Sequence, residues 1–449
     1  MDFHDIITSF AGVQGCEMGS IERDDNELSA VINITQPFHL SRCGFCGDML
    51  LKLHSWLTRD VRASSFFVYS HVTLRCRYAR GLCRSCNKNR VSRILFAHPE
   101  FESMTLGLAE QAGRMMEEMT VAASARLLRL DEKTLWRLDQ WRMEKMHGQM
   151  KLDEIVKNLD VRKLSADEVH FRTIEHQIRE HPFSPRNDIK FVTNLVCTKE
   201  AKVIANAAGR SAQSLAQCLK ALTRPQRLVV EYFSIDMNRG YFQAVQKLCP
   251  NAEIAVDRFH LVQVLNEKFD RVRREEFYKA RKSKNEFQTT MLSPQRRFIL
   301  CERNAVRSPE EDSLLGKLKM LNDTIHNAML IVDYFHKVLD ERSVGGFKKQ
   351  LTMWYRLVRQ AKIKPLIDFA RIVKRYRRNI EAYIKTNLTT AISEGLNNKI
   401  RVLKAMAYGY KNERSFMLKI LQRCGFLNSK FIDTRRWFFE PVWEAWHET

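Results

Sequence analysis

The segment from residue 233 to residue 274 constrains the fold of this 449-residue chain more than any other segment. Two strand-like runs, Arg227 to Ile235 and Glu253 to Val256, are each followed by an aspartate, Asp236 and Asp257 respectively. An acid at the carboxyl end of a β-strand faces the edge of an α/β sheet at which ligands and metals bind. The pattern therefore predicts an α/β sheet with carboxylates gathered along one edge.

Two further acids extend this pattern. Asp167 lies in the strand-like run KLSADEVHF, and Glu394 lies in the helical run TTAISEGLNNKIR. Two strand acids followed, after a long gap, by a helix acid are typical of a two-metal phosphoryl-transfer site. In such a site two cations about 4 Å apart contact the attacking and leaving oxygens. Because Mg²⁺ prefers carboxylate oxygens, we expect Asp167, Asp236 and Glu394 to hold two Mg²⁺ (or Mn²⁺) ions.

Three further residues, Glu168, Asp257 and His260, lie close in sequence to the proposed strand acids or at a strand end. Glu168 adjoins Asp167, but side chains of adjacent strand residues point to opposite faces of a sheet. We therefore expect only one of them to face the site, and Asp167 is preferred. Asp257 is either a fourth ligand or a residue that orients the ligands. His260 either orients a water at the metals or is an ordinary residue of a first helical turn.

The order of the strand candidates between residues 160 and 260 predicts the fold of the catalytic region. Three strands follow one another directly, whereas a helix precedes the fourth strand and another precedes the fifth. This order is that of an RNase H-like fold, in which helical crossovers add parallel strands to an antiparallel meander. The expected elements are strands Lys163–Ala166, Lys190–Cys197, Lys202–Ala207, Arg227–Ile235 and Glu253–Val256, with helices Ser211–Leu222 and Tyr241–Leu248. The stretch Glu175 to Asp188 is predicted to be a long loop.

After residue 260 the strand signal nearly disappears. Basic helical runs dominate residues 261–386, which predicts an all-helical insertion. A basic cluster in it is either solvated surface or a face that contacts phosphates; its residues are Arg371, Lys374, Arg375 and Arg378. Residues 387–449 then contribute the helix Ile392–Met406, which carries the acid Glu394, and an aromatic tail.

Residues 1–95 form a cysteine-bearing module. Two C-x2-C pairs, Cys43 with Cys46 and Cys83 with Cys86, flank a β-rich stretch. Paired knuckles of this kind place four thiolates where a tetrahedral structural Zn²⁺ needs them. Cys76 is a candidate replacement ligand, and His54 and His71 are weaker ones. Buried free thiols are the alternative, and we interpret the single cysteines elsewhere as core residues.

Residues 96–155 read as a helix-turn-helix. Helix Val121–Leu128 is followed by a short turn, and Asp131 is a suitable N-cap for a second helix. The second helix would enter the major groove of DNA; its candidate DNA-binding residues are Lys133, Thr134, Arg137 and Gln140. A plain pair of packed helices is the alternative. Leu135, Trp136 and Leu138 of this helix are available for packing.

The formal net charge of +22 points to a polyanionic partner. Double-stranded DNA is the expected partner, and a ribosome or an anionic membrane surface is the alternative. The sequence holds no apolar run long enough to span a bilayer, and its first residues lack a secretory pattern. We therefore expect a cytoplasmic, nucleoid-associated protein without a membrane partner, whose eleven cysteines are thiols or metal ligands rather than disulfides.

These motifs together resemble those of insertion-sequence DDE transposases, specifically the ISL-three family. The resemblance covers nearly the whole chain, and its most specific blocks are IDMNRGYFQAVQKLCPNAEIAVDRFHLVQVLN and SEGLNNKIRVLKAMAYGYKNERSFMLKIL. It implies that the catalytic acids are Asp167 of the DE dipeptide, Asp236 of the DM motif and Glu394 of the SEG-x-N-N motif. It further implies binding of terminal inverted repeats and target DNA, Mg²⁺-dependent strand cleavage and strand transfer, and a homodimer or larger assembly.

Two other functions remain open at this point. A transposase-derived regulator would keep the DNA-binding modules without catalysis. A structure-selective nuclease of RNase H-like fold would cut branched DNA whatever its terminal sequence, and the N-terminal modules argue against it.

Overall fold

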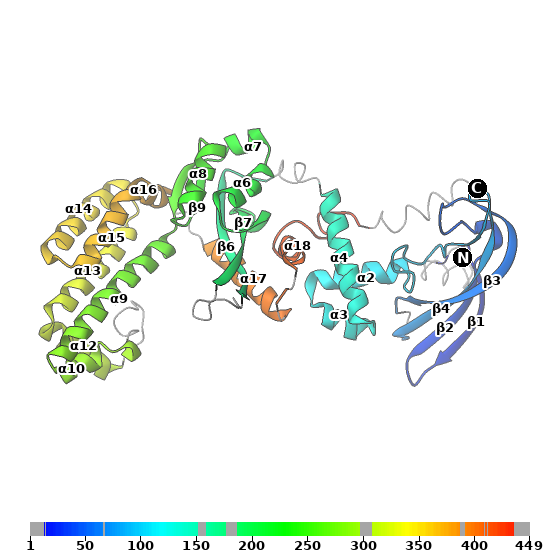
Figure 1. The fold of residues 1–449 in the computed structure, drawn as a ribbon, viewed down its shortest axis with the longest axis horizontal. Helices are drawn as coiled ribbons and strands as arrows, with labels where there is room; N and C mark the ends of the chain where they lie inside the picture. Colours follow the sequence, from blue (N-terminus) through cyan, green and yellow to red (C-terminus); the bar gives the residue numbers. More distant parts are fainter. Residues whose placement is uncertain are drawn as a thin grey trace. The chain divides into compact units, whose positions relative to one another are not determined.

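The computed structural model describes residues 13, 15–65, 68–150, 159–176, 186–296, 308–386, 391–407, 409–410 and 412–434, without the side chains of residues 173–176, 186–189 and 391. The chain is a multidomain α/β protein of two compact units (Figure 1). The first unit joins residues 1–150 to residues 404–449, and the second comprises residues 151–403. The predicted C-terminal region, 387–449, is thus divided between the two units. Its aromatic tail after residue 434 lies outside the described residues.

The first unit begins with a five-stranded sheet in the order β1-β2-β4-β3, to which β5 adds along β4. Alternating buried and half-buried residues in β2, such as buried Ile32 and Ile34, place one face of the sheet on a hydrophobic core with Val61, Leu74 and Phe96. β3 and β4 form the long hairpin expected between the two cysteine pairs. The strands are β1 Glu17–Asp24, β2 Ser29–Thr35, β3 Leu50–Ala63, β4 His71–Cys83 and β5 Asn89–Val91.

The described residues of the first unit also form the helices α2 Leu106–Glu118, α3 Val121–Leu128, α4 Glu132–Gln149 and α18 Glu413–Cys424. Each begins at a residue whose side chain accepts a backbone N–H of the first turn, namely Thr105, Thr120, Asp131 and Asn412. Arg129, at φ 50°, ends α3 and reverses the chain into α4. The bounds of α3 and the cap of α4 agree with the predicted helix-turn-helix pair.

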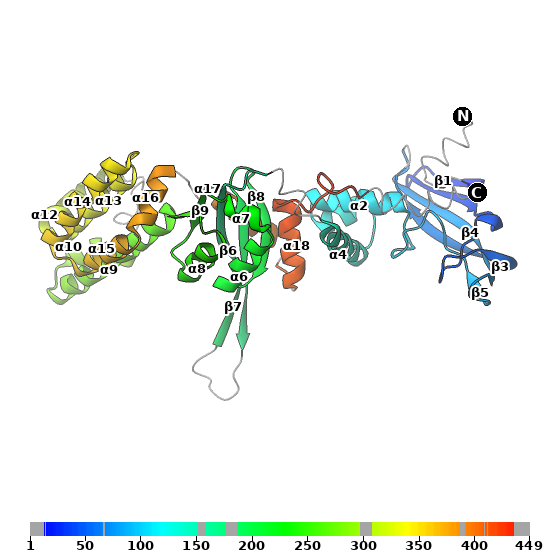
Figure 2. The same cartoon turned by 90° about the horizontal axis from the view of Figure 1, so that it is seen from above.

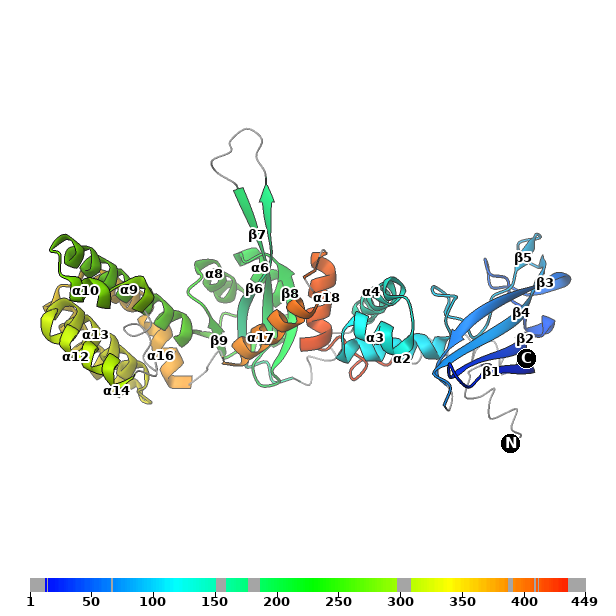
Figure 3. The same cartoon turned by 90° about the horizontal axis from the view of Figure 1, so that it is seen from below.

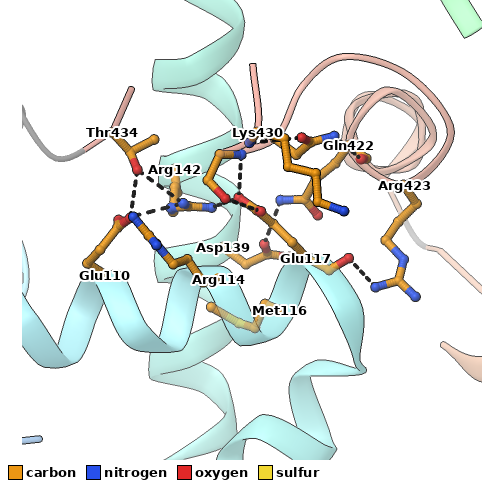
Figure 4. Close-up of polar contacts among 12 residues, drawn as sticks. Glu110, Arg114, Met116, Glu117, Asp139, Arg142, Gln422, Arg423, Lys430 and Thr434 are labelled. Carbon is orange, nitrogen blue, oxygen red and sulfur yellow. Dashed lines mark hydrogen bonds and ion pairs between the residues drawn. The ribbon is translucent and has the colours of Figure 1, made fainter. Parts of the chain in front are cut away.

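Helix α18 packs on α2 and α4 although more than 260 residues of sequence separate it from either helix (Figure 4). The interface is ionic as well as apolar. Lys419 Nζ donates to Asp139 Oδ2 at 2.7 Å and to the Met116 carbonyl at 3.0 Å. Arg142, fully buried, pairs with Glu117 and Glu110. The C-terminal segment is therefore part of the helical core of the first unit.

The second unit is built on a sheet in the order β10-β9-β6-β7-β8. β6, β7 and β8 are antiparallel, and β9 and β10 run parallel to β6, as the sequence order predicts. The strands are β6 Lys163–His176, β7 Arg186–Cys197, β8 Lys202–Ala208, β9 Tyr232–Ile235 and β10 Glu253–Val256. β6 and β7 continue as a ribbon beyond the other strands (Figure 2).

Two details of this sheet differ from the prediction. β9 begins at Tyr232 rather than Arg227, because Thr223 and Gln226 form a capping box around Pro225 and start helix α7, Arg224–Leu228. The expected loop from Glu175 to Asp188 begins and ends as paired strand, since Glu175 is opposite Asn187 in the register. Residues 177–185 lie outside the described part.

Helices cover both faces of the sheet. α6, Ala212–Lys220, and α8, Arg239–Leu248, lie on one face, and α17, Ala391–Met406, lies on the other (Figure 3). Leu164 and Ala166 of β6 pack toward the first face with Leu215 and Tyr241. Ser165 and Asp167 alternate with them and point toward α17.

The described residues from 261 to 386 contain helices and no strand, as predicted for the insertion. α9 leaves β10 directly, and the remaining helices pack around Phe335, Trp354 and Phe369. They are α9 Arg258–Lys282, α10 Glu286–Met291, α12 Pro309–Leu321, α13 Asp323–Leu339, α14 Val344–Ala361, α15 Lys364–Arg375 and α16 Arg377–Thr386. Within the described part of the chain, no helix combines the length and apolar character that crossing a bilayer requires.

Candidate functional site

The two cysteine knuckles meet at one end of the β3–β4 hairpin. The Sγ atoms of Cys43, Cys46, Cys83 and Cys86 all lie within 4.8 Å of one another. A tetrahedral zinc ion with Zn–S bonds of about 2.3 Å requires Sγ separations of about 3.8 Å. The Cys43–Cys86 separation of 3.9 Å and the Cys46–Cys83 separation of 3.4 Å fit that requirement. The four thiols are therefore compatible with a structural zinc site.

The two knuckles have the same backbone geometry. In each, the residue after the second cysteine has a positive φ, 82° at Gly47 and 48° at Asn87, and its N–H bonds to the carbonyl of the first cysteine. Glycine and asparagine adopt this conformation most readily. Burial opposes ionisation of Cys43, but N–H groups of Cys46 and Phe45 outweigh it and lower the pKa of that thiol to about 7. This backbone geometry thus favours a thiolate at Cys43.

Cys76 lies apart from this cluster. It is fully buried in the apolar core of the β-sheet, beside Cys16, and burial raises its pKa to about 12. His54 and His71 are likewise outside the four-thiol group. Cys16, Cys197, Cys218, Cys249 and Cys424 are buried core residues as expected, and Cys301 lies outside the described residues.

In the second unit, strand register brings three acids together. Ser165 of β6 is opposite Ser234 of β9, and Val256 of β10 is opposite Ile235. Continuing both registers past the paired segments sets Asp236 between Asp167 and Asp257. Neighbouring strands are about 5 Å apart. The three carboxyl groups therefore lie side by side along one edge of the parallel part of the sheet.

Helix α17 is hydrogen-bonded to the same strand. Asn397 Nδ2 donates to Asp167 Oδ2 at 2.5 Å, and Ser393 Oγ lies 2.6 Å from Ser165 Oγ. Glu394 follows Ser393 and precedes Asn397 by three residues, so it lies about one turn from Asn397 on the same side of the helix. The structure thus brings the helix that carries Glu394 onto the strand that carries Asp167.

Burial and neighbouring acids raise the pKa of two carboxyl groups at this edge, those of Asp167 and Glu168. Burial, with Asp236 and Asp257 nearby, raises the pKa of Asp167 to about 6. Burial, with Asp236 and Asp167 nearby, raises the pKa of Glu168 to about 7. Carboxylates held this close repel one another unless a cation or a proton lies between them. The donor set is therefore chemically suited to divalent cations, which prefer carboxylate oxygens.

A cavity of about 390 Å³ opens beside these acids. Its lining includes Glu168, Arg210, Asp236, Asn238, His260 and Glu267. Of the two adjacent acids, Glu168 lines the cavity, whereas Asp167 is hydrogen-bonded to Asn397 of α17. Asp167 was preferred as the residue that faces the site, and the cavity lining adds Glu168 as a second candidate.

Asp257 and His260 form a pair at the start of α9. Asp257, 3% exposed, caps the helix by accepting the Phe259 N–H at 3.0 Å, and its other oxygen lies 2.8 Å from His260 Nδ1. This contact, aided by the charges of Asp167 and Asp236, raises the pKa of His260 to about 9. Both oxygens of Asp257 are therefore engaged, and a cationic imidazole faces the cavity.

The predicted DNA-binding residues of α4 fall into two groups. Lys133 and Arg137 are exposed, whereas Thr134 donates to Asp131 at 2.9 Å and Gln140 donates to Glu144 at 3.3 Å. Leu135 and Leu138 are buried as expected. Trp136, also predicted to be available for packing, is 49% exposed and lies on the same outer surface as Lys133 and Arg137.

The basic cluster of the helical insertion is solvent-exposed on α15 and α16. Arg371, Lys374, Arg375 and Arg378 are all exposed, and Arg371 pairs with Asp368 at 2.7 Å. Exposure fits both interpretations of this cluster, a solvated face and a phosphate-contacting face.

Sequence reasoning missed the amide side chains that border Asp167. Asn397 bonds to it, and Asn194 of β7 is opposite it in the register. Asn194 is 1% exposed, and among the described residues neither its Oδ1 nor its Nδ2 has a hydrogen-bond partner. Asn397 could have been predicted to lie near the acids, because it follows Glu394 by three residues on the same helix. Asn194 could not have been predicted, because its place opposite Asp167 follows from the strand register.

Comparison with known proteins agrees with this arrangement. A family model described as a transposase, that of the ISL3-type DDE enzymes, matches residues 178–420. The chain belongs to the ISL3 family of DDE transposases. It is similar to the transposase for insertion sequence element IS1001 of Bordetella parapertussis, with 24% identity over 417 residues, 92% of this chain and 97% of that protein. It is also similar to the transposase for element IS1557 of Mycobacterium tuberculosis, with 21% identity over 276 residues, 58% of this chain and 59% of that protein.

The family resemblance inferred from the motifs is thereby confirmed, and with it the assignment of this transposase to insertion sequences. The matched region begins after β6, so it includes Asp236 and Glu394 but not Asp167 or the four knuckle cysteines. Similarity to the IS1001 transposase extends over nearly the whole length of both chains.

Proposed function

We propose that this ISL3-family transposase binds the terminal inverted repeats of its insertion sequence and cleaves and joins DNA through Asp167, Asp236 and Glu394. The observation that carries the proposal is the hydrogen bond from α17 to Asp167, because it joins the helix of Glu394 to the edge of the sheet where the strand acids lie. The meander of β6, β7 and β8 extended by parallel β9 and β10 supports an RNase H-like core.

In this proposal each residue of the site has a separate role. Asp167 and Asp236 supply carboxylate oxygens from adjacent strands, and Glu394 supplies another from the helix laid across them. Two Mg²⁺ or Mn²⁺ ions held there would neutralise charge that develops at the scissile phosphate. Asp257 orients His260, which presents positive charge to the cavity. Exposed Lys133 and Arg137 contact DNA from α4, and the basic cluster of α15 and α16 contacts phosphates.

The four-thiol cluster is proposed to hold a structural zinc ion. Zinc would fix the two knuckles at the end of the β3–β4 hairpin, where, in the described part of the chain, Leu50 and Phe38 are the apolar side chains clustered with the cysteines. Two element ends have to be brought together for transposition, so we further propose that the protein acts as a dimer or larger assembly on DNA.

Replacement of the acids tests the catalytic proposal. Asp167→Asn, Asp236→Asn and Glu394→Gln should each lower Mg²⁺-dependent cleavage of a supercoiled plasmid carrying the element ends by at least about 10³-fold, because each removes a carboxylate that the transition state needs. Binding of the ends in a gel-shift assay should change less than twofold. Glu253→Gln, at the opposite end of β10 and exposed, is the matched control.

Two results would contradict the assignment. Full activity in any of the three variants removes that residue from the site, and loss of activity in Glu168→Gln with full activity in Asp167→Asn transfers the role to Glu168. Sequence-specific binding without cleavage by the wild-type protein would indicate a DNA-binding regulator instead.

A further inference from the structure

Polar contacts hold α17 on the sheet beside the proposed catalytic acids. Ser165 and Ser393 are 1% and 2% exposed, and Asn397 is 7% exposed. Their bonds, Ser165 to Ser393 and Asp167 to Asn397, repeat every two residues along β6 and every four along α17. These spacings keep both bonds on one face of each element. The helix is thus docked by two directional bonds, which specify its position along the strand more narrowly than apolar packing alone.

Asp167 is the only one of these four residues with an acidic side chain, and both of its oxygens are engaged. Oδ1 accepts the Glu168 N–H at 2.8 Å, and Oδ2 accepts Asn397 Nδ2 at 2.5 Å. Two donors on different oxygens fix the rotation of the carboxylate. Each oxygen retains a lone pair, because a carboxylate has about four acceptor sites.

We propose that Asn397 is a positioning residue for the metal site: its amide sets the orientation of Asp167 and, in the same contact, the distance of Glu394 from it. This inference rests on the proposed function. An amide suits the task because it donates a hydrogen bond without charge. A lysine or arginine at this position would neutralise Asp167 and compete with a divalent cation.

The competing explanation is structural: Asn397 would only satisfy a buried carboxylate. Removing a donor from a buried carboxylate costs stability under either explanation. Metal affinity separates them, because residues that orient metal ligands typically contribute 10- to 100-fold to affinity. A residue with a purely structural role would lower the free energy of unfolding and leave the affinity of the folded protein unchanged.

The experiment compares Asn397→Ala and the nearly isosteric Asn397→Leu with Asn398→Ala in the full-length protein. Asn398 is the adjacent asparagine, but it is exposed and accepts only from Arg401 of its own helix among the described residues. Mn²⁺ binding to the DNA-free protein is measured by electron paramagnetic resonance, and unfolding is measured in urea. The Mg²⁺ concentration that gives half-maximal cleavage is measured in parallel.

We expect both Asn397 variants to raise the Kd for Mn²⁺ and the half-maximal Mg²⁺ concentration about tenfold, and Asn398→Ala to change each less than twofold. Unchanged Mn²⁺ affinity in folded Asn397→Leu would overturn the inference even if cleavage fell. If Asn397→Ala does not fold, Asn397→Leu still decides the question, since it keeps the packed volume. Failure of the wild-type protein itself to bind Mn²⁺ or to cleave would refute the proposed function, and the inference with it.

Discussion

His98 is a buried histidine that the folded protein keeps neutral. Its Nδ1 accepts the backbone N–H groups of Glu100 and Phe101, both at 3.1 Å, and its ring packs edge-on against Trp141. Burial, together with the charge of Lys145, lowers the pKa of His98 to about 4. Because the unfolded chain takes up the proton first, the stability that His98 contributes is complete above about pH 6.5 and falls as the pH drops toward 4.

We therefore expect the free energy of unfolding of the first unit to fall by about 2 kcal/mol more between pH 7 and pH 5 in the wild-type protein than in His98→Asn. Asparagine can accept the same backbone N–H groups but does not titrate. Urea unfolding at the two pH values measures the difference. Parallel pH dependence in the two proteins would contradict the assignment.

At this scale the sequence located acids but not their surroundings. Asp167, Asp236 and Glu394 were chosen from strand ends and motif resemblance, and the structure places their elements in contact. The position of Glu168 at the cavity and the burial of the Asn194 amide were not predictable, because both depend on which helix covers which face of the sheet. The alternation of side chains along a strand does not indicate which face of the sheet a helix will cover.

Elements were predicted best where a local signal starts or ends them. α3 and β10 have the expected bounds because caps and turns close both ends. β9 was predicted too long, since the apolar residues Leu228 to Val230 resemble a strand while the Thr223 capping box makes helix of their first part. The sequence pattern did not predict the extension of the β6–β7 ribbon, because that extension depends on pairing between two separate strands and not on a local signal.

The knuckle pair predicts how the N-terminal module depends on metal. Cys43→Ser combined with Cys46→Ser should lower bound zinc by one equivalent per chain and weaken binding of the element ends by about tenfold or more, because the ends of β3 and β4 lose their cross-link. Plasma emission spectrometry and gel shifts measure the two effects.

Cys76→Ala is the matched control for that variant, because Cys76 lies on β4 but in the apolar core. It should lower stability and leave the zinc content unchanged. Wild-type protein free of zinc, or zinc loss in Cys76→Ala, would refute the choice of ligands.

At the scale of the whole molecule, helix α18 stabilises helices α2 and α4, which lie far from it in the sequence. Lys419 and Asp139 are 6% and 4% exposed, and they bond at 2.7 Å across 280 residues of sequence. Breaking one side of such a pair leaves a buried charge uncompensated, which costs about 3 kcal/mol or more. The sequence did not predict this contact, because a lysine in a basic helix is usually exposed to solvent.

Lys419→Met should therefore lower the free energy of unfolding of the first unit by about 3 kcal/mol. Adding Asp139→Asn should recover part of that loss, since no buried charge is then left unpaired. Lys430→Met is the control, because its pair with Glu118 is exposed and 3.8 Å long, and it should change stability by less than about 0.5 kcal/mol. Urea titration of all four proteins measures these free energies of unfolding. An equal loss of stability in Lys419→Met and Lys430→Met would contradict the buried-pair explanation.

The docking of α18 on α2 and α4 has a consequence for synthesis of the protein. The ribosome makes residues 106–149 long before residues 413–424, so α2 and α4 lack their partner α18 until that later segment has been made. A stop codon or frameshift before residue 413 would give a product in which the faces of α2 and α4 that α18 covers are exposed to water. We therefore expect truncated copies of this gene to yield unstable protein.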